Sequence, residues 1–238
     1  METQKRKQNE KEKAERRMKI VAGLGSIDEY IPYVLAGADE LFCGYVPYNW
    51  TKKYGTVLPL NRREVLAYNV QLGSFSELEI LLAMIRKYRK PVHIAMNSLY
   101  YIPEQYEEIA DIVKQCMKIG FDSFILADPA LILYLRQKGI SCKIHLSGEV
   151  GEMNREAIKV FREMGIGRII FHRKNTVASM RQMIEAVNAE RLEFEAFALN
   201  ELCQFTGAFC NSLHCDEMGY LCRTTYWEML RWKSVWNE

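Results

Sequence analysis

The chain has 238 residues and a formal net charge of +2, with 49% hydrophobic and 26% charged residues. This length suits one large domain, and an α/β barrel uses about this length as a single domain. The near balance of charge gives no general nucleic-acid signature, and no apolar run reaches the roughly 18 residues that a membrane helix needs.

The N-terminal segment is polar and highly charged. Lysines and arginines alternate with glutamates, and no large apolar side chain lies between Met1 and Arg17. Such a segment buries no apolar surface, so we expect residues 1–18 to form a solvated helix or a flexible tail. A basic arm that touches RNA or another polyanion is the alternative. Because the segment lacks the apolar core of a signal peptide, we expect a cytoplasmic protein with no membrane contact and few disulfides.

From Lys19 onward, short apolar runs alternate with stretches whose apolar residues recur at helical spacing. The runs predict seven strands, over residues 19–23, 40–44, 91–97, 123–128, 143–147, 168–172 and 193–198. Strands and helices that alternate at about 25–30 residues per unit are typical of a parallel sheet. We therefore predict an α/β fold, a TIM-barrel-like (β/α) barrel over residues 19–202. Because a closed barrel has eight strands, this one is expected to be incomplete.

Common enzyme motifs are absent from the sequence. The stretch Gly23-Leu-Gly25-Ser-Ile-Asp28 lacks the third glycine of the dinucleotide-binding pattern. There is no P-loop, no His-Glu-x-x-His zinc motif and no Gly-x-Ser-x-Gly nucleophile elbow. No Ser/His/Asp or Cys/His set can be picked out either, so a hydrolytic mechanism has no visible nucleophile or activated water.

Four of the seven cysteines gather in one stretch, at Cys203, Cys210, Cys215 and Cys222. In an intracellular protein such clusters are more often metal ligands than disulfides, and thiolates suit soft metals and iron–sulfur clusters. The spacing differs from the paired Cys-x2-Cys of common zinc sites. We predict that this cysteine segment, residues 203–222, holds a metal or cluster through its four cysteines, with His214 as an alternative ligand. Free thiols and disulfides are the alternatives.

The candidate catalytic residues lie where predicted strands end, because a barrel builds its active site at the carboxyl ends of its strands. His172 and Arg173 end a strand and could meet an anionic substrate. Asn97 could equally orient a substrate or bind loop backbone. The full set at these ends is Asn97, Asp128, Ser147, Glu149, His172, Arg173, Asn200 and Glu201. The chosen catalytic candidates are Asn97, Ser147, His172, Arg173 and Glu201.

Other residues fit structural roles. Asp128 precedes Pro129 and is typical of a helix N-cap. His145 lies within a predicted strand, which favours a hydrogen-bonded core histidine over a ligand or base. Residues 45–61, rich in Tyr, Pro, Asn and Gly, predict a long irregular loop of the kind that is often functional. The cysteines outside the cysteine segment are expected to lie in the core; they are Cys43, Cys116 and Cys142.

The C-terminal region, residues 203–238, joins the cysteine segment to a tail with three tryptophans among basic residues. Exposed aromatic surface usually marks an interface, and open sheet edges are normally covered or paired. We expect the aromatic tail, residues 224–238, either to cover the open edge of the barrel or to dock on a partner, as a hetero-complex or a homo-oligomer.

Several short motifs follow one another in a fixed order: Ala36-Gly37-Ala38-Asp39, Asn97, Asp128-Pro129, Ile144-His145-Leu146-Ser147, Asn154, Arg173 and the closing Cys222-Arg223. In this order and spacing the chain resembles the U32 peptidase family, the collagenase-like proteases, from about Lys19 to Arg223. The match is weakest at Cys215, because the run between Cys210 and Cys222 is shorter than in the family. The family also continues beyond this motif, so we expect a partner chain that completes the barrel or a reduced member of the family.

The resemblance implies a TIM-barrel-like fold and a 4Fe–4S cluster on the cysteines, with zinc as the alternative cofactor. Several members resemble oxygen-independent hydroxylation or RNA-modification factors. Some resemble subunits that act on quinone precursors, and others act on tRNA or ribosomal RNA and depend on prephenate. We therefore predict an iron–sulfur-dependent modification enzyme or subunit that hydroxylates a small molecule or an RNA base. The alternatives are a collagenase-like endopeptidase and a non-catalytic scaffold stabilised by its cluster.

Overall fold

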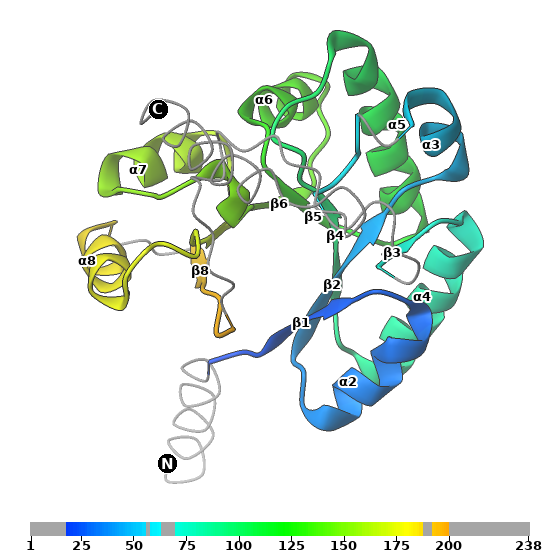
Figure 1. Ribbon diagram of the computed structural model, residues 1–238, viewed down its shortest axis with the longest axis horizontal. Helices are drawn as coiled ribbons and strands as arrows, with labels where there is room; N and C mark the ends of the chain where they lie inside the picture. The colour runs from blue at the N-terminus through cyan, green and yellow to red at the C-terminus, as the bar shows by residue number, and fades with distance from the viewer. Residues whose placement is uncertain (1–17, 56–57, 63–69, 188–191, 200–238) are drawn as a thin grey trace, which may run out of the picture.

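The structure is a computed structural model that describes residues 18–55, 58–62, 70–187 and 192–199. It is built on one parallel sheet with the strand order β1-β2-β4-β5-β6-β7-β8 (Figure 1). A short extra strand, β3, pairs with the end of β2. The strands are β1 (Val21–Leu24), β2 (Glu40–Tyr45), β3 (Gln71–Leu72), β4 (Val92–Met96), β5 (Ser123–Leu126), β6 (Lys143–Leu146), β7 (Arg168–Ile170) and β8 (Glu193–Glu195).

Helices connect successive strands and lie on the outer, convex side of the curved sheet (Figure 1). They are α2 (Tyr30–Ala36), α3 (Tyr48–Tyr54), α4 (Phe75–Tyr88), α5 (Pro103–Ile119), α6 (Pro129–Gln137), α7 (Arg155–Glu163) and α8 (Val177–Val187), with short 3-10 turns η1 (Ile27–Glu29) and η2 (Gly148–Val150). All seven predicted strands are present. The predicted α/β fold, an incomplete TIM-like barrel, is therefore confirmed as a half-barrel of seven parallel strands, to which β3 adds one pair that the sequence pattern did not reveal.

Local sequence explains where several helices begin. Asp128 accepts a hydrogen bond from the Ala130 backbone N–H at 2.8 Å, and Pro129 follows at the first helical position. This confirms the predicted N-cap of α6, since an N-cap side chain satisfies an otherwise unpaired backbone donor. Asn154 does the same for α7, where its Oδ1 accepts from the Glu156 and Ala157 N–H groups at 3.0 and 2.9 Å.

The predicted loop over residues 45–61 is wrong in part, because Tyr48–Tyr54 forms α3 directly after Pro47. Trp50 anchors this helix: its side chain is 1% exposed, and its Nε1 donates to the Leu58 carbonyl at 3.1 Å. The Tyr54 ring lies 4.5 Å from the Trp50 ring. The abundance of Tyr, Pro and Asn hid a short helix that is held by aromatic packing rather than by an aliphatic pattern.

The sheet separates two apolar clusters. The larger one fills the space between the sheet and the helices and includes Leu41, Ile94 and Phe124. The smaller one consists of Ala95, Ile125 and Ile170 with Phe42 packed against them. Side chains alternate between the two faces of a strand, and the strand registers put these four residues on the inner, concave side. We call this side the lumen.

Gly23 makes room for the aromatic member of the lumen cluster. A Cβ atom at this position would lie 2.9 Å from the Phe42 ring. A side chain at this position, on an edge strand of the sheet, would therefore force the Phe42 ring to shift.

The two edges of the sheet are β1 and β8, and no ladder joins them within the part of the chain that the structure describes. At the amino ends of these strands Lys19 Nζ lies 3.6 Å from Glu193 Oε1. The edges thus come within ion-pair distance without backbone pairing, which agrees with the predicted incomplete barrel.

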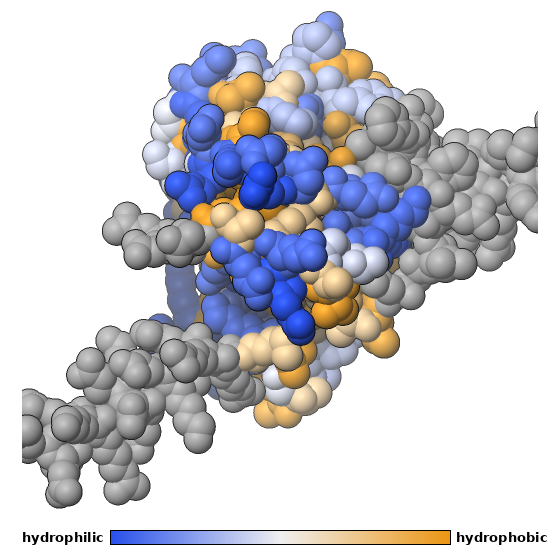
Figure 2. Space-filling view, turned by 90° about the vertical axis from the view of Figure 1, so that its left-hand side faces the viewer, coloured by the Kyte–Doolittle hydropathy of each residue, from blue (hydrophilic) through white to orange (hydrophobic). Residues whose placement is uncertain are grey.

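The surface over α7 and α8 is mainly hydrophilic, with smaller hydrophobic patches between the polar groups (Figure 2). The large apolar side chains that these helices expose are Val160, Val177 and Ile184. Single exposed apolar residues are normal on a protein surface. None of the helices in the described ranges is long and apolar enough to cross a membrane.

Candidate active site at the carboxyl ends of the strands

Asn97 and Ser147 meet at the carboxyl end of the sheet, as their positions after β4 and β6 predict. Asn97 Nδ2 donates to Ser147 Oγ at 3.3 Å. On its other side Asn97 Oδ1 accepts the backbone N–H of Arg62 at 3.1 Å. Of the two roles open to Asn97, binding loop backbone is therefore observed. The side chain also fixes the Ser147 hydroxyl, which is buried.

Ser147 begins the turn η2, and its Oγ accepts the backbone N–H of Glu149 at 3.3 Å. The next residue, Gly148, lies against the end of β7. A Cβ atom there would stand 2.9 Å from the Phe171 carbonyl oxygen. Only glycine fits this close approach. The turn is therefore held against the end of β7, which fixes the position of Glu149 at the carboxyl ends of the strands.

Glu149 lies between two arginines. Its Oε1 accepts from Arg173 Nη2 at 2.6 Å, and its Oε2 lies 3.2 Å from Arg62 Nε. All three side chains are largely buried, so the carboxylate and the guanidinium groups are only partly screened by water. Guanidinium groups in such a setting suit bidentate recognition of phosphates and carboxylates. We call Asn97, Ser147, Glu149, Arg62 and Arg173 the mouth site.

His172 lies beside the mouth site with only 2% of its surface exposed. Burial lowers the pKa of its imidazole, which favours the neutral form. Its Nδ1 accepts the backbone N–H of Lys174 at 3.2 Å, so the neutral ring carries its proton on Nε2. The side chain is placed as a neutral donor rather than as a second cation beside Arg173.

The remaining candidates divide into two groups. Asp128 caps α6, as described above, and also accepts the phenol of Tyr106 at 3.0 Å. The others lie outside the described residues, and their predicted roles stay predictions; they are Asn200, Glu201, Cys203, Cys210, His214, Cys215 and Cys222.

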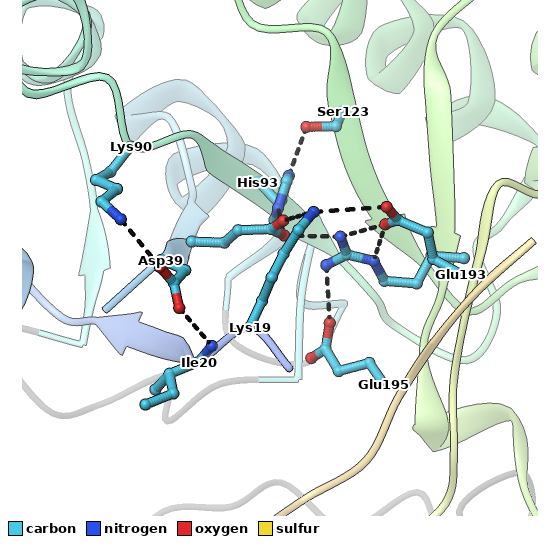
Figure 3. Close-up of polar contacts among 10 residues, drawn as sticks. Lys19, Ile20, Asp39, Lys90, His93, Ser123, Glu193 and Glu195 are labelled. Carbon is cyan, nitrogen blue, oxygen red and sulfur yellow. Dashed lines mark hydrogen bonds and ion pairs between the residues drawn. The ribbon is translucent and has the colours of Figure 1, made fainter. Parts of the chain in front are cut away.

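A second polar cluster fills the lumen at the amino ends of the strands (Figure 3). Glu40 Oε2 lies 2.7 Å from Arg168 Nη2 and 2.9 Å from His93 Nε2, while Glu40 Oε1 accepts from Lys19 Nζ at 2.7 Å. Arg168 also binds the two carboxylates of β8. We call this group the lumen network; its members are Lys19, Glu40, His93, Ser123, Arg168, Glu193 and Glu195.

Burial and partners shift the lumen groups in different directions. Burial opposes ionisation of Glu40, but hydrogen bonds from His93, Lys19 and Arg168 outweigh it and hold the pKa of Glu40 well below its usual range. Burial raises the pKa of Glu195 despite the neighbouring Arg168.

His145 lies next to the lumen network. It is 5% exposed, and its ring is 4.4 Å from that of His93. Burial lowers the pKa of His145 to about 3. His145 is thus a core histidine, as predicted, but its Nδ1 has no hydrogen-bond partner among the described residues.

The lumen network contains a serine–histidine–glutamate relay. Ser123 Oγ lies 2.6 Å from His93 Nδ1, and His93 Nε2 lies 2.9 Å from Glu40 Oε2. These are the residue types and distances of a nucleophile, a base and an orienting acid. However, Ser123 is 3% exposed and lies at the amino ends of the strands, and the apolar lumen cluster separates it from the mouth site. Within the part of the chain that the structure describes, the Ser123 hydroxyl is thus shielded from substrate, which indicates a structural role for the relay.

This geometry gives a prediction about hydrolysis. We expect the purified protein not to cleave casein or gelatin, and the Ser123→Ala variant to behave identically, because the relay is closed to substrate. Zymography of both proteins checks this. Cleavage by the wild type that disappears in Ser123→Ala would contradict the prediction and restore the endopeptidase interpretation.

The fold and the mouth site define a parallel (β/α) half-barrel with a polar, arginine-containing site at the carboxyl ends of its strands. The sequence profile of peptidase family U32 matches residues 25–215. The chain therefore belongs to peptidase family U32, as the motifs had indicated.

Two relatives have names that describe RNA chemistry. The tRNA hydroxylation protein P1 of Bacillus subtilis (strain 168) is 22% identical over 214 residues, which covers 88% of this chain and 46% of the relative. The tRNA hydroxylation protein P of Escherichia coli (strain K12) is 25% identical over 174 residues, which covers 73% of this chain and 34% of the relative. The chain thus spans about half the length, or less, of these curated relatives.

Solved structures with the same fold include the U32 peptidase Mk0906, with a TM-score of 0.50 at 16% identity over 75% of this chain and 67% of that one. A glycerophosphodiester phosphodiesterase from Parabacteroides distasonis ATCC 8503 also has a TM-score of 0.50, at 12% identity over 77% of this chain and 85% of that one. At such identities the likeness concerns the fold alone.

Sequence reasoning missed Arg62 and the whole lumen network. Arg62 comes directly after the segment 45–61, whose composition had marked it as functional, but nothing in the sequence pairs it with Glu149. The lumen network had a clearer signal. Glu40, Arg168 and Glu193 are the first residues of three strands, and the first residues of parallel strands meet at one end of a barrel.

Proposed function

We propose that this protein is an RNA-modification factor that acts on tRNA at the mouth site, and that its reaction is an oxygen-independent hydroxylation. The observation that carries the proposal is the pair of arginines that flank Glu149 beside Asn97 and Ser147. Guanidinium groups recognise phosphate oxygens, which every tRNA presents. The family relatives named for tRNA hydroxylation point to the same substrate class.

The residues of the mouth site have distinct roles in this proposal. Arg62 and Arg173 bind the negative charge of the substrate, and Glu149 orients both guanidinium groups. Asn97 and Ser147 supply short polar side chains that can hydrogen-bond a base or ribose. His172 is a neutral proton donor at the same edge. Their fixed neighbours in the protein preorganise these groups before the substrate binds.

We further propose that the cysteine segment holds a 4Fe–4S cluster. Among the described residues, no group of three or more His, Cys, Asp or Glu side chains could hold a metal ion. Cys43, Cys116 and Cys142 are buried, and burial raises the pKa of Cys116 to about 12 and also raises that of Cys142. The thiols of Cys116 and Cys142 therefore stay protonated, so they are poor ligands.

The ligands of the proposed cluster are Cys203, Cys210, Cys215 and Cys222, with His214 as the alternative for Cys215. Four cysteine thiolates are the usual ligand set of a 4Fe–4S cluster. When bound, such a cluster supplies one-electron transfer. Zinc remains the alternative metal for the same donors.

The first test of the proposal is tRNA binding. We expect Arg173→Gln to weaken tRNA binding and to lower the slope of log affinity against log salt by about 0.7–0.9, since one phosphate contact is lost. Fluorescence anisotropy with labelled tRNA at several salt concentrations measures both. Lys143→Gln is the matched control, because Lys143 is an exposed cation at the opposite end of the sheet.

The two variants also decide the outcome for the reaction. Hydroxylated nucleosides, measured by mass spectrometry of tRNA from cells that express each protein, should fall with Arg173→Gln and persist with Lys143→Gln. Equal tRNA affinities for the two variants would show that the mouth site does not bind tRNA.

A second test concerns the metal. Protein purified without oxygen should be brown and carry about four iron atoms per chain, the content of one 4Fe–4S cluster. Cys203→Ala, Cys210→Ala and Cys222→Ala should each lose iron, as followed by elemental analysis and EPR. Full iron in Cys215→Ala would assign the fourth position to His214. Stoichiometric zinc without iron would reject the cluster.

A further inference from the structure

Arg168 links three strands from inside the lumen. It is the first residue of β7, and its guanidinium binds both carboxylates of the adjacent β8. Nε donates to Glu193 Oε2 at 2.8 Å and Nη1 donates to Glu195 Oε2 at 3.0 Å. Nη2 also donates to Glu193 and lies 2.7 Å from Glu40 Oε2 on β2. Since β4, β5 and β6 lie between β2 and β7 in the sheet, this side chain spans the lumen.

Backbone pairing holds β8 only weakly. The strand has three residues, and in the described part of the chain it pairs with β7 alone. On the outer face the Phe194 ring stacks on that of Phe171 at 5.6 Å. On the lumen face Arg168, whose side chain is buried, donates three hydrogen bonds to the β8 carboxylates, and Lys19 adds an exposed ion pair with Glu193 at 3.6 Å. A short edge strand with one neighbour has few bonds against local opening.

The position of β8 matters for the mouth site. Phe197 comes two residues after the strand, and its ring centroid lies 5.8 Å from Arg173 Cζ, a cation–π arrangement. Arg173 in turn donates to Glu149 at 2.6 Å. A shift of β8 would therefore move Phe197 away from the arginine that the proposed function assigns to substrate binding.

We infer that Arg168 is a positioning residue: its guanidinium holds β8 against the lumen so that Phe197 keeps Arg173 in place beside Glu149. The inference deepens the proposed function, on which it rests for its effect on tRNA. Lysine is a poor substitute because one ammonium group cannot reproduce the planar fork that engages three carboxylates at once. The lumen network thereby connects the amino ends of the strands to the site at their carboxyl ends.

Hydrogen–deuterium exchange of the full chain tests the inference. Arg168→Lys keeps the positive charge but removes the planar guanidinium. The peptide covering residues 192–199 should then exchange its amide hydrogens at least about tenfold faster than in the wild type, because the charged hydrogen bonds that hold β8 are lost. Peptides from β4 and β5 should keep their protection. Lys143→Met is the matched control: it removes an exposed ion pair with Asp122 at the same end of the sheet and should leave β8 unchanged.

A double variant separates positioning from general stability. Glu40→Gln/Arg168→Met removes the buried Glu40 and Arg168 charges together, and it should be more stable to heat than Arg168→Met alone because the Glu40 carboxylate is no longer left without the guanidinium. If Arg168 positions β8, residues 192–199 stay fast to exchange in this double variant although the stability has recovered. If their protection returns with the stability, Arg168 is merely a stabilising residue and the inference is wrong.

Measurements of tRNA binding test a different part of the inference, the link from Arg168 to Arg173. Arg168→Lys should weaken tRNA binding as Arg173→Gln does, although Arg168 lies at the far end of the strands, and normal tRNA affinity with a loosened β8 would overturn the link to Arg173. If the wild type binds no tRNA, the proposed function fails. The exchange of residues 192–199 still decides the role of Arg168 in that case.

Discussion

Replacing Glu40 by glutamine is expected to lower the free energy of unfolding by about 3–5 kcal/mol, the usual cost of breaking a buried ion pair from one side. The Glu40 carboxylate accepts from Lys19 and His93 and pairs with Arg168. The amide keeps the shape of the side chain but not its charge, so the Arg168 guanidinium loses its partner on β2. Chemical denaturation at neutral pH measures the change.

Asp122→Asn is the control for this prediction. It also removes one carboxylate paired with a lysine near the start of a strand, but the side chains of Asp122 and Lys143 are 65% and 70% exposed. Exposed pairs contribute about 0–1 kcal/mol, so this variant should be close to the wild type. Equal effects of the two substitutions would show that the lumen network does not stabilise the half-barrel.

The strands were predictable because their signal is local. Most of the seven are short apolar runs bounded by a helical pattern or a turn, as parallel strands buried on both faces require; β8, in contrast, has two glutamates around Phe194. β3 was not predicted because its two residues, Gln71 and Leu72, are too few to show a hydrophobic period. The helix α3 was not predicted because the aromatic residues that anchor it, Trp50 and Tyr54, lie within a segment whose composition indicates a loop.

The mouth site was predictable in part, for a different reason. Asn97, Ser147, Glu149 and Arg173 follow strand ends, and barrel geometry brings all strand ends to one edge. Which of them touch could not be predicted, because contacts such as that between Arg173 and Glu149 depend on the length and path of the turns. Gly148 illustrates this, since the need for glycine at this position arises from the carbonyl oxygen of Phe171, which directly follows β7.

The lumen network also explains why charged residues occur in strands of a buried sheet. Arg168 with Glu193, and Ile170 with Glu195, are register partners on β7 and β8, so both glutamates point into the lumen where the guanidinium can reach them. In a closed barrel, apolar residues at these positions would stabilise the fold about as well as the ion pairs do. In this half-barrel, an ionic group that spans the lumen holds β8, which has one strand neighbour among the described residues.

The protein should lose stability as the pH falls below about 6.5. The pKa of His145 is lowered to about 3 by burial, whereas an unfolded chain has a histidine pKa of about 6.5. Between these values the unfolded state binds a proton that the folded state does not, so acid favours unfolding. For this one group the loss is about 2 kcal/mol between pH 6.5 and 5, at 1.36 kcal/mol per pH unit.

Other groups modify this slope in known directions. The lowered pKa of His172 acts with the same sign. The depressed pKa of Glu40 adds a further loss below about pH 4.5, where unfolded glutamate begins to take up protons. Glu195 acts in the opposite sense, since its raised pKa favours the protonated form in the folded state.

Urea denaturation at intervals from pH 8 to 4 tests the prediction. In His145→Gln the loss between pH 6.5 and 5 should shrink by about 2 kcal/mol, while the part below pH 4.5 that belongs to Glu40 remains. This assignment depends on the buried Nδ1 of His145 lacking a partner among the described residues, because a hydrogen-bonded, solvated histidine would titrate near its normal value. A pH profile that is unchanged in His145→Gln would mean that the ring takes up its proton over the same pH range in the folded as in the unfolded protein, and that His145 carries positive charge beside His93 at acid pH.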